Sequence, residues 1–211
     1  MADGVGLKFV ALGDSLTVGF QSPSMFLPGR EEFPYTRFLD IILGRELPRK
    51  GLSRIQVSFG NAGMLGDTVR SMLGRFDSHV AAEEPDHVIV WGGINDLFML
   101  RTPETIVGDL KQIYSRALEA GIGPIACTVT PVIGPDDLGP YILELNDMVR
   151  GYCIEHRVPL ADLFAATSDE SGRLRETFSS DGVHLSHAGY QRVAFTLYYE
   201  VIEPILDGLK K

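Results

Sequence analysis

Residues 7–15, with the sequence LKFVALGDS, join an apolar run to a glycine, an acid and a serine. A continuous apolar run is typical of a β-strand that is buried on both faces, as in a parallel sheet. Further runs of this kind recur along the chain, at residues 55–59, 88–91, 122–129 and 158–161. The sequence therefore predicts a sheet of five parallel strands.

Helix-length segments separate these runs. Residues 35–43 place apolar side chains on one helical face, and residues 138–155 and 187–206 have helical patterns too. Thr102 and Pro103 are typical of a helix start, with Thr102 as the N-cap. Strands that alternate with helices predict right-handed crossovers and an α/β fold, a three-layer α/β/α sandwich with flavodoxin-like strand order.

Length and composition favour one globular domain that spans residues 1–211. Hydrophobic residues make up 45% of the 211 positions and charged residues 22%, as in ordinary globular proteins. A formal net charge of -9 disfavours nucleic acid or an anionic membrane as the main partner. We expect Cys127 and Cys153 to be free, buried thiols.

The sequence contains no apolar run of the length that a membrane span needs, and its first residues lack the layout of a signal peptide. We therefore expect no membrane span and a cytoplasmic location. The oligomeric state is not readable from the sequence.

Chemistry is expected at the carboxyl ends of the strands, where open α/β sheets bind their ligands. Ser15 follows the first strand directly, after Gly13 and Asp14. Its hydroxyl would lie exposed at the edge of the sheet. Taken alone, a serine at this place is more often a helix N-cap.

Two more polar segments follow strands two and three. Residues 61–68 include Gly66, whose N–H would be free to point into a site, and residues 91–96 include Asn95, which offers an amide donor. Plain turns are the alternative for each segment. Near the last helix, Asp181 lies three residues before His184, a spacing at which a carboxylate can hold the imidazole ring.

Together these four segments resemble those of the SGNH hydrolase family, also called the GDSL esterases and lipases, and the match runs from Gly13 to His184. The resemblance implies that Ser15 is the nucleophile, that His184 is the base and that Asp181 is its partner. It implies an oxyanion hole made of the backbone N–H groups of Ser15 and Gly66 and the side chain of Asn95. It also implies a flavodoxin-like fold, in agreement with the strand count.

The expected function is that of a serine esterase, which cleaves short-chain acyl esters of small molecules without a metal or an organic cofactor. Carbohydrate O-acetyl esterase, lysophospholipase, thioesterase and acyltransferase activities remain open as alternatives. We expect the apolar side chains of Phe98, Val132 and Phe178 to contribute to an acyl pocket.

Two hypotheses from other functional classes compete with the esterase hypothesis. Asp181, His184 and His187 lie close together in sequence and suggest a metal site, although no further acid or histidine cluster completes a ligand shell. A non-catalytic flavodoxin-like binding module is the second. No Walker loop, G-x-G-x-x-G run or G-x-S-x-G elbow occurs, which disfavours nucleotide binding and the α/β-hydrolase family.

Overall fold

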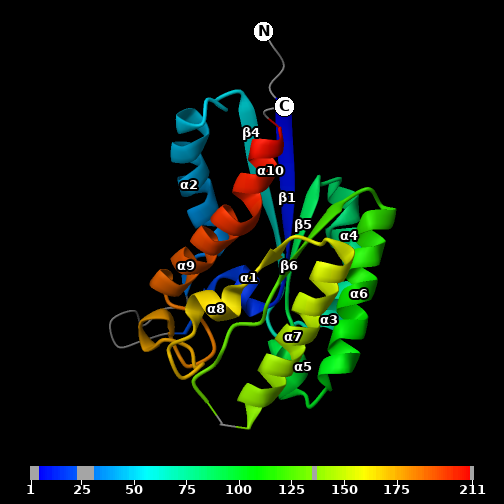
Figure 1. Cartoon of the computed structure of the whole chain (residues 1–211), viewed down its shortest axis with the longest axis vertical. Helices are drawn as coiled ribbons and strands as arrows, with labels where there is room; N and C mark the ends of the chain where they lie inside the picture. The colour runs from blue at the N-terminus through cyan, green and yellow to red at the C-terminus, as the bar shows by residue number, and fades with distance from the viewer. Residues whose placement is uncertain (1–4, 23–30, 135–136, 210–211) are drawn as a thin grey trace.

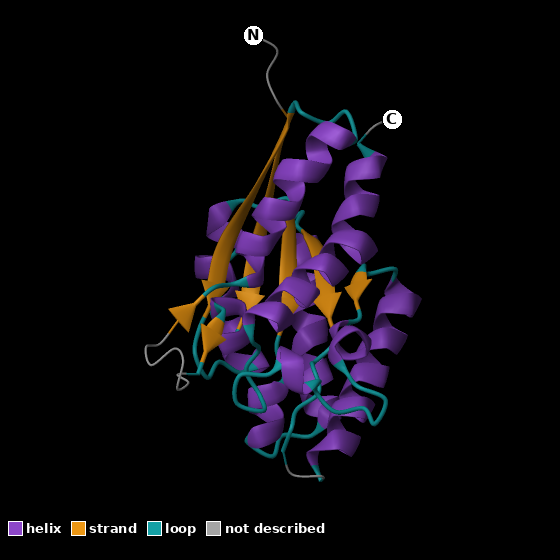
Figure 2. Cartoon of the chain, turned by 90° about the vertical axis from the view of Figure 1, so that its left-hand side faces the viewer, coloured by secondary structure: helices purple, strands orange, loops and turns teal. Residues whose placement is uncertain are grey.

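The computed structural model describes residues 5–22, 31–134 and 137–209. Its central sheet has five parallel strands in the order β4-β1-β5-β6-β7, which confirms the predicted flavodoxin-like sheet. The strands are β1 (Val5–Gly13), β4 (Ile55–Gly63), β5 (His87–Trp91), β6 (Gly123–Cys127) and β7 (Leu160–Ala161). Figure 2 shows the strands pointing to one end of the molecule, where the loops gather.

Helices cover both faces of the sheet, as a three-layer sandwich requires (Figure 1). The layer on one face contains α2 (Tyr35–Arg49), α9 (His187–Leu197) and α10 (Glu203–Gly208). The other layer contains α3 (Val69–Gly74), α4 (Phe76–His79), α6 (Pro103–Glu119) and α7 (Leu138–His156). Three short helices follow strands at their carboxyl ends: α1 (Ser15–Val18), α5 (Ile94–Phe98) and α8 (Leu163–Thr167).

The helix boundaries follow local chemistry. Thr102 caps α6 by accepting a hydrogen bond from the backbone N–H of Thr105, and Pro103 opens the helix, as predicted. The helix predicted over residues 187–206 is real but not uniform. A π-helical segment, η3 (Tyr198–Ile202), joins α9 to α10. Two 3₁₀ turns, η1 (Ala81–Glu83) and η2 (Glu176–Phe178), complete the helical elements.

Two features differ from the sequence-based expectation. Strand β4 continues to Gly63, because its polar end pairs in register with the end of β1. The segment 20–34, expected as a loop, carries the short antiparallel strands β2 (Phe20–Gln21) and β3 (Glu31–Glu32), while residues 23–30 lie outside the described residues.

The core lies between the sheet and its helices and contains several large aromatic side chains. Trp91 of β5 and Tyr35 of α2 are both fully buried and meet edge to face, with ring centroids 5.7 Å apart. Cys127 and Cys153 are buried free thiols, as predicted. Among the described helices, none combines the length and the apolar character that a bilayer crossing demands.

Gly13 ends β1 at the most crowded point of the sheet edge. A Cβ at this position would lie 2.1 Å from Thr17 Oγ1 and 2.5 Å from the carbonyl oxygen of Trp91. Both distances are far below van der Waals contact, so only glycine fits here without movement of its neighbours.

Gly13→Ala should lower the free energy of unfolding by about 1–3 kcal/mol, the usual cost of overpacking. Gly6→Ala is the matched control, because Gly6 lies on the same strand and a Cβ there meets nothing within 4 Å. The control should change stability by no more than about 0.5 kcal/mol. Urea denaturation of the two variants measures both effects, and equal stabilities would contradict the steric argument.

Candidate functional site

Ser15 begins α1, directly beyond the end of β1. The N-cap of this helix is Asp14, whose Oδ1 accepts a hydrogen bond of 2.9 Å from the backbone N–H of Leu16. The interpretation of Ser15 as a capping residue is therefore wrong, and its hydroxyl is available to other groups. Ser15 Oγ lies 3.0 Å from His184 Nε2, although the two residues are 169 positions apart in the chain.

Asp181 holds the other side of the histidine ring. Asp181 Oδ2 lies 2.7 Å from His184 Nδ1, and Asp181 Oδ1 accepts the backbone N–H groups of Val183 (3.0 Å) and His184 (2.7 Å). A carboxylate at Nδ1 favours the tautomer that carries its proton there. The Nε2 lone pair is then directed at the Ser15 hydroxyl.

Asp181 is charged at neutral pH. Partial burial alone would raise its pKa, but hydrogen bonds from the Ser22 hydroxyl, from His184 and from the local backbone outweigh burial and lower the pKa to about 2. A charged carboxylate is what a histidine needs in order to accept a second proton.

The turn that carries Asp181 and His184 packs against the segment after β6. Gly182 has a φ of 97°, and its carbonyl accepts a hydrogen bond of 2.7 Å from the backbone N–H of Ile133. A Cβ on Gly182 would lie 2.5 Å from the Ile133 carbonyl oxygen, so this position requires glycine for both its conformation and its packing.

The segments that follow strands β4 and β5 also reach the neighbourhood of Ser15. Asn95 Nδ2 donates to the backbone carbonyl of Asp67 at 2.9 Å and lies 3.5 Å from Asp14 Oδ2. The Asn95 amide thus lies between the residue that precedes Ser15 and the residue that follows Gly66. Gly66 itself is exposed and has a φ of 71°. The structure gives no acceptor to the backbone N–H groups of Ser15 and Gly66 among the residues that it describes.

A buried ion pair connects these segments, and no sequence motif indicates it. Arg75 contacts the Asp67 carboxylate at 2.7 Å and also donates to the backbone carbonyl of Gly13 at 3.1 Å. Nearby, the buried carboxylate of Asp96 accepts the backbone N–H of Val69 at 2.9 Å. The acids that follow Gly66 and Asn95 in sequence therefore fix the backbone around the site.

The three residues predicted for an acyl pocket lie on different segments and differ in exposure. Phe98 is exposed at the end of α5, Val132 is buried, and Phe178 ends the turn η2 and packs partly on the core. Val132 lines a cavity of about 260 Å³, and neither Phe98 nor Phe178 lines it. Their role in binding an acyl group stays a prediction.

His187 does not join Asp181 and His184 in a ligand set. Its ring stacks on Phe33, with centroids 5.0 Å apart, and packs on Phe38. Within the described part of the chain, no three histidine, cysteine, aspartate or glutamate side chains are grouped in a way that fits a metal ion.

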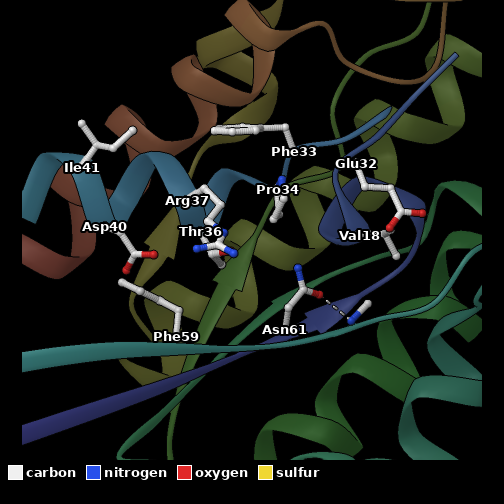
Figure 3. Close-up of a pocket in the computed structure, with 11 residues that line it drawn as sticks. Val18, Glu32, Phe33, Pro34, Thr36, Arg37, Asp40, Ile41, Phe59 and Asn61 are labelled. Atoms are coloured by element: carbon white, nitrogen blue, oxygen red, sulfur yellow. Dashed lines mark hydrogen bonds between the residues drawn. The ribbon is translucent and has the colours of Figure 1, made fainter. Parts of the chain in front are cut away.

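A groove with a volume of about 960 Å³ lies between α2 and the edge strand β4. Figure 3 shows Arg37 and Asp40 projecting from α2 toward the strand, with Phe59 of β4 beneath them. Val18, three residues after Ser15, lines the end of the groove next to α1. Ser15 and Val18 are the two ends of α1, so this end of the groove lies one helical turn from Ser15, although neither Ser15 nor His184 lines the groove.

Asp14 has an unusual electrostatic environment for a residue next to the site. It is fully buried, and this burial, together with the nearby carboxylates of Asp67 and Asp96, raises its pKa to about 7. Because the folded chain then binds this proton more tightly than the unfolded chain, the contribution of Asp14 to stability falls as the pH rises from about 4 to about 7.

Asp14→Asn should remove this dependence while keeping a side chain that can cap α1. The unfolding free energy of the variant should therefore gain on that of the wild type as the pH rises through this window. Urea denaturation at several pH values measures the difference, and parallel pH curves for the two proteins would show that Asp14 is not the titrating group.

Comparison with known proteins places this geometry in a family. Residues 11–192 match the model of the GDSL-like lipase/acylhydrolase family. The chain is 26% identical over 208 residues to an acetylxylan esterase of Geobacillus stearothermophilus, with 94% of this chain and 84% of the relative aligned.

Solved structures show the same fold. A Desulfitobacterium hafniense protein assigned to the G-D-S-L family of lipolytic proteins superposes with a TM-score of 0.71 at 26% identity, over 90% of this chain and 96% of that one. An acetylxylan esterase from Geobacillus stearothermophilus superposes with a TM-score of 0.76 at 22% identity, over 95% and 96% of the two chains. This chain belongs to the GDSL-like lipase/acylhydrolase family and is a hydrolase of ester bonds.

Proposed function

We propose that the protein hydrolyses short-chain acyl esters through an acyl-enzyme on Ser15. The contact between Ser15 Oγ and His184 Nε2, at 3.0 Å, is the observation that carries the proposal. The hydrogen bond of 2.7 Å between His184 Nδ1 and Asp181 supports it, since a nucleophile, a base and an orienting acid in series are the groups that acyl transfer needs.

In the first half of the reaction, Ser15 Oγ attacks the ester carbonyl carbon and its proton passes to His184 Nε2. Asp181 stabilises the imidazolium that forms. His184 then gives this proton to the departing alcohol oxygen as the carbon–oxygen bond of the ester breaks. In the second half, water gives a proton to His184 Nε2 as its oxygen attacks the acyl carbon. The bond between the acyl carbon and Ser15 Oγ then breaks, His184 returns the proton to Ser15 Oγ, and the acid leaves.

The negative charge on the carbonyl oxygen needs donors in the transition state. We assign this role to the backbone N–H groups of Ser15 and Gly66 and to the side chain of Asn95. The side-chain amide nitrogen of asparagine carries two hydrogens. Asn95 uses one to reach the Asp67 carbonyl, which fixes the amide plane. The other makes only the long contact of 3.5 Å with Asp14 Oδ2 and would exchange it for the oxyanion.

Ser15→Ala and His184→Ala should each lower kcat/KM for p-nitrophenyl acetate by at least about 10⁴-fold, because each removes a member of the reacting unit. Ser115→Ala, at an exposed site on α6, is the control and should keep wild-type activity. Circular dichroism checks that all three variants fold. Retention of activity by a folded Ser15→Ala variant would refute the mechanism.

An acetylated saccharide is a second candidate substrate, favoured by the groove beside β4 and by the named activity of the relative from Geobacillus. The volume of the groove is near the upper end of the range for small-molecule sites and far exceeds the volume of an acetyl group. Phe59 offers an apolar face, Glu32 and Asp40 offer acceptors, and Arg37 offers donors. A ligand rich in hydroxyl groups, which both donate and accept, can bond to groups of both kinds.

Arg37→Ala and Phe59→Ala should lower kcat/KM for acetylated xylo-oligosaccharides by about tenfold, which corresponds to the loss of one charged hydrogen bond or one apolar contact. The rate with p-nitrophenyl acetate should stay unchanged, since this small ester does not reach the groove. Arg70→Ala is the arginine control, because Arg70 lines a separate groove formed with α6. Equal losses on both substrates would argue against a saccharide subsite.

A further inference from the structure

The Asp181 carboxylate accepts four hydrogen bonds in the described structure, and one has a different origin from the rest. Three donors come from the turn itself: two backbone N–H groups and His184 Nδ1. The fourth is the hydroxyl of Ser22, which donates to Oδ2, the same oxygen that faces the histidine. Ser22 is 159 positions away in the chain.

Ser22 follows β2, and its backbone N–H donates to Ser180 Oγ at 3.4 Å, next to the turn. The strand also has anchors outside this segment. The Phe20 carbonyl accepts a hydrogen bond of 2.8 Å from the buried hydroxyl of Tyr190, and β2 pairs with β3. The Phe20 ring also meets the His184 ring edge to face, with centroids 4.6 Å apart. The strand therefore contacts the His184 ring through Phe20 and the Asp181 carboxylate through Ser22.

This contact matters because the acid and the histidine are both partly open to solvent. The side chains of Asp181 and His184 are 29% and 22% exposed. The backbone donors all bind Oδ1, so they do not by themselves fix the direction in which Oδ2 presents its lone pairs. A second donor to Oδ2 restricts rotation of the carboxylate and occupies a place that water would otherwise take.

We propose that Ser22 is a positioning residue of the reaction, which acts through Asp181 to keep His184 aligned with Ser15. The proposal rests on the proposed mechanism. Ser22 meets Asp181 and not the reacting serine. Its loss should therefore lower kcat and leave KM unchanged, because alignment is needed for the chemical step and not for ester binding.

Ser22→Ala should lower kcat for p-nitrophenyl acetate by about tenfold, less than the loss in Asp181→Ala. Ser22→Thr keeps the hydroxyl and should restore kcat to within about threefold of the wild type. Ser171→Ala is the matched control: Ser171 also donates to a carboxylate, that of Asp169 at 2.7 Å, but away from this site. It should leave both kcat and KM unchanged.

A spectroscopic signal separates positioning from a general loss of structure. The proton on His184 Nδ1 should give a downfield NMR resonance in the wild type, which weakens in Ser22→Ala through faster exchange with solvent and returns in Ser22→Thr. A folded Ser22→Ala variant with wild-type kcat, a change in KM alone, or failure of threonine to restore the rate would each overturn the proposal. Activity in Ser15→Ala would instead overturn the mechanism on which it rests.

Discussion

The part of the site that carries Ser15 depends on the hydrogen bonds that the backbone carbonyl of Gly13 accepts. This carbonyl accepts hydrogen bonds from the backbone N–H of Met64 at 3.0 Å and from the Arg75 guanidinium at 3.1 Å. Arg75 in turn binds the Asp67 carboxylate, and the Asp67 carbonyl receives Asn95. The ends of three neighbouring strands are thus joined by direct bonds that begin at the residue two positions before Ser15. This carbonyl sits where it does because no side chain separates the ends of β1 and β5.

The part of the site that carries Asp181 and His184 is formed by segments late in the chain and by the short strand β2. The 181–184 turn is held by its own backbone, by Ile133 and by the Ser22 hydroxyl. The two halves are joined by the contact between Ser15 Oγ and His184 Nε2 and by the chain itself, since only Gly19 separates α1 from β2. This arrangement explains why the proposed oxyanion donors and the proposed acid–base pair occupy distant parts of the sequence.

Much of this arrangement is predictable from sequence, for physical reasons that also set the limit. Buried parallel strands are continuous apolar runs, so all five strands were predicted, and topology alone brings their carboxyl ends to one edge. Asp181 and His184 are three residues apart, a local spacing that a pattern can capture.

The contact of Ser22 with Asp181 has no such pattern, since it joins residues 159 positions apart through a two-residue strand that is too short to show periodicity. The apolar pattern does not predict the polar end of β4. This end is stabilised by its pairing with β1, and its apolar content is low. Pocket residues such as Phe98 depend on the packing of loops, which composition does not specify.

The role of Ser15 as the nucleophile is tested most directly by covalent labelling of the native chain with a fluorophosphonate, followed by mass spectrometry of its peptides. A hydroxyl activated by an adjacent imidazole reacts with this reagent, whereas ordinary serines do not. We expect a single adduct on Ser15, formed much more slowly in His184→Ala. An unmodified Ser15, or an adduct on a different serine with Ser15 left free, would contradict it.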